Sequence, residues 1–185
     1  MKSSKILALG ALMLGASQFA HANLVTNGDF ETGDFTGWTL FGNTGFTGVA
    51  SGNGVGGSYG AYFGAVGTAG GIYQQTLATV AGATYTFSFD LANDGGTFNS
   101  VDVQFDGASV LSGTNLNGFG FTPNSYSVIA STASTTISFA FQQDPAYYYL
   151  DNVSVVQSSV PDGGSTVALL GVGVLGVVAL RRKLA

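Results

Sequence analysis

The sequence predicts an all-β protein in which two antiparallel sheets pack as a sandwich, and three observations lead to this fold class. First, residues 84–91, 100–106 and 137–142 alternate apolar and polar side chains, as half-buried strands do. Second, 29 glycines and only 8% charged residues favour short strands and tight turns over helices. Third, the 185 residues leave room for one ordinary domain between the two ends of the chain.

The individual strands follow from the same period of two. In the first alternating segment the odd positions from Tyr85 to Leu91 are apolar, and the second segment ends at the turn dipeptide Asp106-Gly107. Weaker strands are predicted at residues 38–41, 61–63, 72–77, 125–129 and 153–156. Glycine-rich residues 43–60, together with 94–96 and 112–118, are predicted as loops at the ends of the sandwich, where ligand sites commonly lie.

The N-terminus has the three parts of a secretion signal. Lys2 and Lys5 form a basic patch, residues 6–19 are an apolar run, and Ala20-His21-Ala22 has the small-x-small pattern that signal peptidase cleaves. We therefore predict a helical signal peptide over residues 1–22 and an exported mature chain. The alternative is an uncut N-terminal anchor, which the shortness of the apolar run disfavours.

The C-terminus, residues 158–185, combines a short motif, an apolar run and a basic end. Residues 160–166 resemble the VPDSG variant of the PEP-CTERM class of sorting signals, although glycine stands at position 163 where the variant has serine. The motif residues are Val160, Pro161, Asp162, Gly163, Gly164, Ser165 and Thr166. A transmembrane helix is predicted at about residues 165–180, and the basic residues Arg181, Arg182 and Lys183 are predicted to stop it on the cytoplasmic side.

This resemblance implies processing by an exosortase in a Gram-negative-type bacterium that makes exopolysaccharide. The chain would be anchored transiently in the inner membrane by its C-terminal helix and then reach the cell surface or the extracellular matrix. A plain C-terminal anchor is the alternative.

The middle of the chain lacks several residue types that chemistry requires. All five Lys and Arg residues lie in the two ends, so residues 23–160 carry no cation with which to bind the phosphates of nucleic acid. The chain has no cysteine, and its one histidine, His21, falls in the predicted signal. Thiolate, Ser-His and ordinary zinc chemistry are therefore excluded. Two carboxylates could in principle hydrolyse a glycosidic bond, but no pair is singled out, so we predict a protein that is not an enzyme.

Residues 23–157 are predicted to form the ectodomain, and both of its ends resemble a known family. Residues 23–38 are similar to the first strand of carbohydrate-binding modules with a galactose-binding-like jelly roll, and residues 149–155 are similar to their last strand. The resemblance implies a jelly-roll sandwich in which these strands pair around one structural Ca²⁺. The matching positions are Asp29, Glu31 and Asp151. Solvated carboxylates without a metal are the alternative.

Aromatic residues are the candidates for contact with carbohydrate. Tyr147, Tyr148 and Tyr149 cannot all point inward from one strand, so at least one should reach a loop cleft or solvent. Trp38 is expected in the core, since a lone tryptophan at the start of a strand is usually a packing residue.

The sequence thus predicts an exported, non-enzymatic bacterial surface or matrix protein that associates with exopolysaccharide, after signal peptidase and exosortase have acted on it. The alternative is a structural surface-coat or matrix protein that binds other proteins and no glycan.

Overall fold

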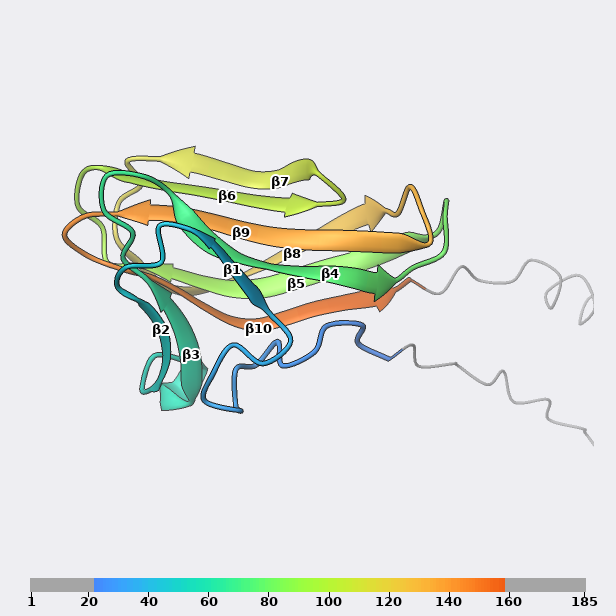
Figure 1. The fold of residues 1–185 in the computed structure, drawn as a ribbon, viewed down its shortest axis with the longest axis horizontal. Helices are drawn as coiled ribbons and strands as arrows, with labels where there is room; N and C mark the ends of the chain where they lie inside the picture. The colour runs from blue at the N-terminus through green and yellow to red at the C-terminus, as the bar shows by residue number, and fades with distance from the viewer. Residues whose placement is uncertain (1–21, 159–185) are drawn as a thin grey trace, which may run out of the picture.

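The computed structural model describes residues 22–158, which form a two-layer sandwich of antiparallel strands (Figure 1). The first sheet has the order β1-β4-β9-β6-β7 and the second sheet the order β2-β3-β10-β5-β8. The predicted fold class is confirmed. The signal peptide, the sorting motif and the C-terminal helix were predicted for segments that lie outside the described residues, apart from the residues at their inner borders. Within the described range, no helix is long and apolar enough to cross a membrane.

The first sheet consists of β1 (Thr39–Gly42), β4 (Gly70–Ala78), β9 (Ser134–Gln143), β6 (Asn99–Phe105) and β7 (Ala108–Thr114). The second sheet consists of β2 (Thr47–Ser51), β3 (Tyr59–Phe63), β10 (Tyr148–Gln157), β5 (Thr84–Asn93) and β8 (Phe119–Ile129). One 3₁₀ turn, η1 (Val55–Gly57), precedes β3. Each strand predicted from the period of two or as a weaker strand corresponds to one of these elements.

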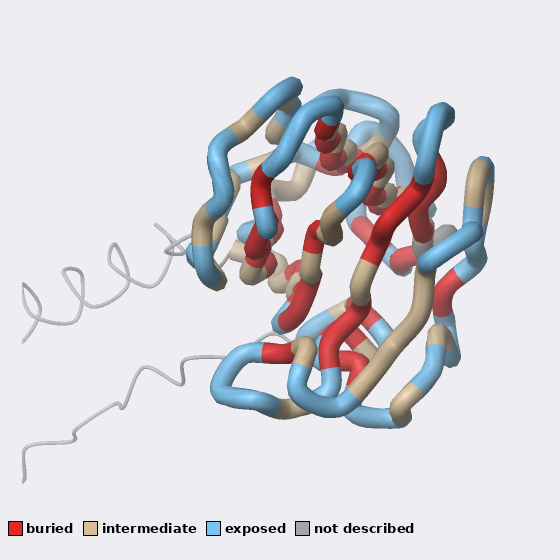
Figure 2. Tube along the Cα trace, turned by 90° about the vertical axis from the view of Figure 1, so that its left-hand side faces the viewer, coloured by how far each residue is buried: buried red, intermediate tan, exposed pale blue. Residues whose placement is uncertain are grey.

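The core lies between the two sheets and is largely aromatic. The strands in the middle of each sheet turn their apolar positions inward. Buried residues are concentrated along these strands, whereas exposed residues lie in the turns and along the edge strands (Figure 2). Phe139 of the first sheet meets Phe87 and Phe89 of the second edge-on, with ring centroids 5.8 and 5.2 Å apart. The chain has no cysteine, so this packing joins the two sheets without any disulfide.

The opening segment closes one side of the sandwich against the last strand. The Leu24 amide donates to the Val155 carbonyl (2.9 Å), and the Val153 amide donates to the Gly28 carbonyl (2.8 Å). Trp38 is buried against Phe30, with ring centroids 5.8 Å apart, and its indole N–H donates to the Asn27 carbonyl (3.1 Å). The prediction that Trp38 belongs to the core is confirmed.

Three sequence-based assignments are corrected by the structure. Residues 23–38 run beside β10 as turns and not as a strand, because several of them have positive φ angles, Asn27 and Phe30 among them. Residues 43–60 were expected as a loop but contain β2, whose Val49 pairs with Ala61 of β3. β7 likewise continues to Thr114, into the expected 112–118 loop. Backbone pairing with a neighbouring strand decides both cases, and glycine-rich sequence gives little sign of it.

Candidate functional site

The outer face of the first sheet carries two rows of side chains that run across the strands, and the central position of each row holds a small residue. Strand register places Phe41, Gly71, Ala140, Asp102 and Ser112 in one row across all five strands. On β4, β6 and β9 the neighbouring alternate positions, Ile72, Val101, Val103, Phe139 and Phe141, are buried, so the side chains of the row point away from the core there. Glycine and alanine in the middle of the row leave space between the aromatic ring on β1 and the polar side chains on β6 and β7.

The next row also has a small residue, Ser138, at its centre, but the residues on either side of it are larger. It runs through Thr39, Tyr73, Ser138, Gln104 and Ser109. Tyr73 on β4 lies beside Phe41 on β1, with ring centroids 6.0 Å apart and planes inclined by 43°. Both rings are half-buried, so part of each remains accessible. The two rings form an aromatic wall on one side of the space above the small residues.

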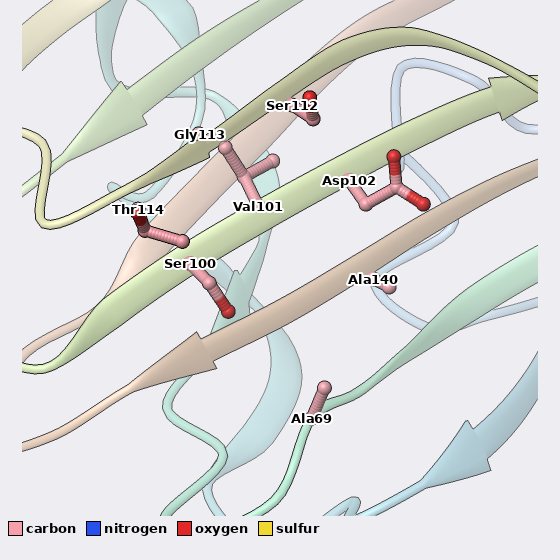
Figure 3. Close-up of a pocket in the computed structure, with 8 residues that line it drawn as sticks. All are labelled: Ala69, Ser100, Val101, Asp102, Ser112, Gly113, Thr114 and Ala140. Carbon is pink, nitrogen blue, oxygen red and sulfur yellow. The ribbon is translucent and has the colours of Figure 1, made fainter.

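Two adjoining hollows of about 400 and 360 Å³ occupy this face, and Asp102 and Ala140 line both. We call the combined depression the sheet groove. Figure 3 shows its part over β6, β7 and β9, where Ser100 and Asp102 on β6 lie between Ser112 on β7 and Ala140 on β9. The remaining lining residues are Phe41, Ala69, Tyr73, Val101, Gln104, Gly113, Thr114, Thr136 and Ser138.

Asp102 lies in the middle of the sheet groove and is held in place by two neighbours. The Gln104 amide donates to its Oδ2 (2.5 Å), and the Ser109 hydroxyl donates to its Oδ1 (2.6 Å). Residues 22–158 contain no Lys or Arg, so the carboxylate has no ion-pair partner there. It therefore keeps acceptor capacity for the hydroxyl groups of a ligand. The sheet groove thus combines an aromatic wall with fixed hydrogen-bonding groups, an arrangement suited to a neutral, polyhydroxylated molecule.

The sequence predicted a different set of aromatic contacts, and one member of that set is wrong. Tyr148 is 0% exposed: it packs against Phe141 and donates its hydroxyl to Asn99 Oδ1 (2.7 Å). Burial raises the pKa of this phenol to about 12. Because Tyr148 points into the core, it cannot contact carbohydrate in the folded sandwich.

Tyr147 and Tyr149 are both partly exposed, so their contact with carbohydrate stays a prediction. Their ring centroids lie 6.2 Å apart, and Tyr149 donates its hydroxyl to Asp94 Oδ2 (3.0 Å). Burial and the neighbouring Asp94 raise the pKa of Tyr149 to about 12. The tyrosine hydroxyl therefore stays protonated and acts as a donor at neutral pH.

The sheet groove was missed from the sequence because its parts come from separate strands. Asp102 is one of the polar residues of the predicted alternating segment 100–106, and Phe41 and Tyr73 fall within predicted strands. Nothing in the sequence shows that β1, β4, β9, β6 and β7 are neighbours in that order. The one signal in the sequence that could have indicated the groove was the pair of small residues at the polar positions of β9, Ser138 and Ala140.

The predicted calcium ligands lie partly together. Asp151 is 1% exposed, and its Oδ2 accepts a hydrogen bond from the Val55 amide (2.8 Å). Glu31 Oε1 accepts from the Tyr59 amide (3.1 Å), so both carboxylates hold the segment around η1. Asp29 is exposed and accepts from the Glu31 amide (3.4 Å). Across residues 22–158, no group of three or more His, Cys, Asp or Glu side chains is placed to hold a metal ion.

The Asp151 carboxyl lies in an unfavourable electrostatic environment. Burial raises its pKa above the ordinary value, and the negative charges of Asp90 and Glu31 raise it further. Hydrogen bonds from the backbone amides of Val55 and Asn152 act in the opposite direction and offset part of this effect. The folded protein therefore carries a buried anion without a cationic side chain beside it, which costs free energy unless the group is protonated or a cation binds.

Comparison with known proteins yields two family matches. Residues 22–151 match a family described as a carbohydrate binding domain, and residues 159–184 match the VPDSG-CTERM motif. The two resemblances noted in the sequence are thereby confirmed. No curated protein matches the chain in sequence.

Solved structures with a similar fold include one in complex with an oligosaccharide and one xylan-binding domain. TmCBM61, in complex with β-1,4-galactotriose, has a TM-score of 0.56 and 17% identity, and the match covers 74% of this chain and 99% of that one. The CBM22-1 xylan-binding domain of Paenibacillus barcinonensis Xyn10C has a TM-score of 0.55 and 14% identity, with 78% and 99% covered.

The same fold also occurs in a protein of another kind. The Stig cyclase Fisc from Fischerella sp. TAU has a TM-score of 0.54 and 18% identity, with 76% of this chain and 99% of that one covered. At such low identities the likenesses show the fold alone. Function must therefore be argued from the family and from the site itself.

The environment of Asp151 predicts how stability changes with pH in the presence of a chelator. Because the folded-state pKa lies above the unfolded value near 3.8, the cost of the buried charge is present above the folded pKa and disappears as the pH falls through it. When the pH is lowered from about 7 to about 4, we expect the free energy of unfolding of the wild-type protein to rise relative to that of Asp151→Asn. Urea denaturation at both pH values measures this difference. A relative loss on acidification would contradict the prediction.

Proposed function

The chain belongs to the carbohydrate binding domain family, and from this premise we propose that it is an exported, non-enzymatic protein whose sandwich binds a neutral polysaccharide through the sheet groove. The observation that carries the proposal is the groove's composition: Phe41 and Tyr73 form an aromatic wall beside an oriented Asp102. The flat face of an aromatic ring matches the C–H face of a pyranose, and carboxylate and hydroxyl groups match its hydroxyls.

The dimensions of the groove suit a chain of sugars. Its rows cross five strands, which corresponds to four interstrand spacings of ~4.8 Å, or about 19 Å from β1 to β7. A depression of that length, open along its course, accommodates several units of an extended polysaccharide. Ala140, which lines both hollows, provides the floor on which the sugar rings would lie.

The negative charge of the sandwich distinguishes between neutral and anionic glycans. Nine of the ten acidic residues lie before the sorting motif, and residues 22–158 contain no Lys or Arg. An anionic polysaccharide would meet repulsion and no cationic partner. The groove therefore favours a neutral glycan, which in this proposal is part of the exopolysaccharide around the cell.

The C-terminal motif supports a destination outside the cytoplasm. We propose that an exosortase in a Gram-negative-type bacterium removes the basic end after transient anchoring in the inner membrane, and that the sandwich is then displayed at the surface or released into the matrix. The signal peptide at the other end would direct export through signal peptidase.

We further propose one structural Ca²⁺ at the predicted positions. Because no three carboxylates of residues 22–158 gather into one cluster, backbone carbonyl oxygens would have to complete its ligands. Asp151 and Glu31 contact the same segment around η1, and Asp29 is the third carboxylate of the predicted set. Hard oxygen donors are the ligands that calcium prefers. A cation there would also stabilise the buried Asp151 carboxylate and so lower its raised pKa.

Removing the aromatic wall should weaken glycan binding. We expect Phe41→Ala with Tyr73→Ala to lower affinity at least tenfold, or about 1.4 kcal/mol, because the stacking surface is lost. Affinity electrophoresis in gels that contain xylan, β-1,4-galactan or β-glucan measures this. Ile129→Ala, which shortens a 65% exposed side chain on the second sheet, serves as the control and should migrate like the wild type. Wild-type migration unretarded in every gel would favour the surface-coat alternative.

Calcium should stabilise the sandwich against heat. At a free concentration one hundred times the dissociation constant, the expected gain is about 2.7 kcal/mol, seen as a rise of the melting midpoint over a chelator-treated sample. Glu31→Gln should abolish the rise, whereas Asp144→Asn, at an exposed carboxylate elsewhere, should retain it. A midpoint that does not respond to calcium or chelator would end the calcium proposal.

Sorting should shorten the protein at its C-terminus. We expect the intact mass of the mature protein from its own bacterium to lack Arg181, Arg182 and Lys183, because cleavage near the motif removes everything beyond it. A Pro161→Ala, Asp162→Ala variant should keep the basic end. A mature wild-type protein that still contains Arg181 would count against exosortase processing.

A further inference from the structure

We infer that the sandwich has a second glycan-binding face, on the outer side of the second sheet, so that one molecule can bridge two polysaccharide chains. The face consists of Tyr62, Tyr147, Tyr149 and Asp94, which we call the tyrosine surface. This inference rests on the proposed function of the sheet groove. It assigns two residues, Tyr62 and Asp94, that the sequence did not single out, and it places the surface on the opposite layer of the sandwich (Figure 1).

Strand alternation and register bring the tyrosines to one face. Tyr149 lies on β10 between two residues that are fully buried, and Tyr62 lies on β3 between Ala61 and Phe63, which are also buried. Both tyrosines therefore point away from the core. The two are Cα partners in the β3–β10 ladder, so their side chains are direct neighbours across the strands.

Tyr147 completes the aromatic surface from the turn before β10. Its ring centroid lies 5.6 Å from that of Tyr62, with the planes at 82°, and 6.2 Å from that of Tyr149. The three rings are half-buried, so each retains accessible area. A packing cluster would have lost this area to the core.

Two glycines let these rings lie close to the backbone. A Cβ added at Gly64 would lie 2.7 Å from the Tyr147 ring, and one added at Gly48 would collide with the end of the Tyr62 side chain. Glycine at these positions thus allows the rings to lie close to the backbone of the sheet. In the sheet groove the small side chain of Ala140 likewise leaves space between larger neighbours.

Asp94 gives the tyrosine surface its polar group. Its Oδ2 accepts the Tyr149 hydroxyl (3.0 Å), which orients the carboxylate, and the residue is exposed. The cores of protein–protein interfaces are depleted of charged residues, whereas sugars need acceptors for their hydroxyls. Aromatic rings around an oriented carboxylate repeat the chemistry of Phe41, Tyr73 and Asp102. We therefore assign a neutral glycan, and not another protein, to this face.

The two sites cannot serve one short sugar segment together. They lie on the outer faces of different sheets, and packed sheets are separated by about 10 Å before their outer side chains are counted. A polysaccharide lying in the sheet groove would have to wrap around the sandwich to reach the tyrosine surface. Separate chains, or distant parts of one chain, are the natural pair of ligands, and cross-linking of the polysaccharide follows.

Isothermal titration of the purified full chain, in a detergent without a sugar headgroup, tests the inference with xylohexaose and with β-1,4-galactotriose as probes. We expect two oligosaccharides bound per wild-type chain. The pair Tyr62→Ala and Tyr149→Ala should reduce this to one, and so should the pair Phe41→Ala and Tyr73→Ala. Tyr59→Ala, at a 38% exposed tyrosine on the same strand as Tyr62, should leave two.

Further measurements keep the outcomes separate. Tyr149→Phe retains the ring but loses the hydrogen bond to Asp94, so it should weaken only the second binding event severalfold while the melting midpoint stays near that of the wild type. One bound oligosaccharide in the wild type, lost only in the Phe41 and Tyr73 variants, would overturn this inference and leave the proposed function standing. No binding of either probe, with no retardation in the polysaccharide gels, would contradict both. Sedimentation analysis could instead show that the wild type self-associates and that the tyrosine substitutions abolish this association. That result would identify the face as a protein interface and overturn the inference.

Discussion

Aromatic packing between the two sheets is the interaction on which the rest of this structure depends. Phe139 contacts rings of the opposite sheet, and Phe63 stacks on Phe141 with centroids 4.5 Å apart. No disulfide is possible, so burial of these rings is the main favourable term that holds the layers together. Because side chains alternate along a strand, committing one set of positions to the core assigns the other set to the outer faces. The inward aromatic residues therefore determine which residues a ligand can meet.

On both outer faces, small residues leave depressions between larger side chains. Gly71 and Ala140 lower the middle of the first sheet, and Gly48 and Gly64 let tyrosine rings lie low on the second. Each face then combines accessible aromatic area with a carboxylate oriented by a neighbouring hydroxyl: Asp102 by Ser109, and Asp94 by Tyr149. Strands carry all of the groove except Ala69, and they carry about half of the tyrosine surface, so little ordering is required when a ligand binds.

The absence of cationic side chains connects stability with ligand choice. Within residues 22–158 every fixed side-chain charge is negative, so no carboxylate gains an ion pair with Lys or Arg. Exposed acids such as Asp34 are satisfied by hydroxyl and amide donors, which lower the pKa of Asp34. The buried Asp151 instead has a raised pKa, because desolvation exceeds the effect of its two backbone donors. The same lack of positive charge that leaves Asp151 without a partner makes the surface favour neutral glycans over anionic ones.

The amino-acid sequence by itself determined the strand pattern, the inward positions, the core place of Trp38 and the resemblance to carbohydrate-binding modules and sorting signals, because these depend on local periodicity and short motifs. It did not reveal β2 and β7, whose pairing is with neighbouring strands, and it counted Tyr148 among the exposed candidates, although alternation along β10 turns Tyr148 inward and Tyr149 outward. Only the tertiary structure decided that Phe41, Tyr73 and Asp102 share one face and that Tyr62 joins Tyr147 and Tyr149. The physical reason is that strands distant in the sequence become neighbours through long-range hydrogen-bonded pairing, and no local pattern encodes their order.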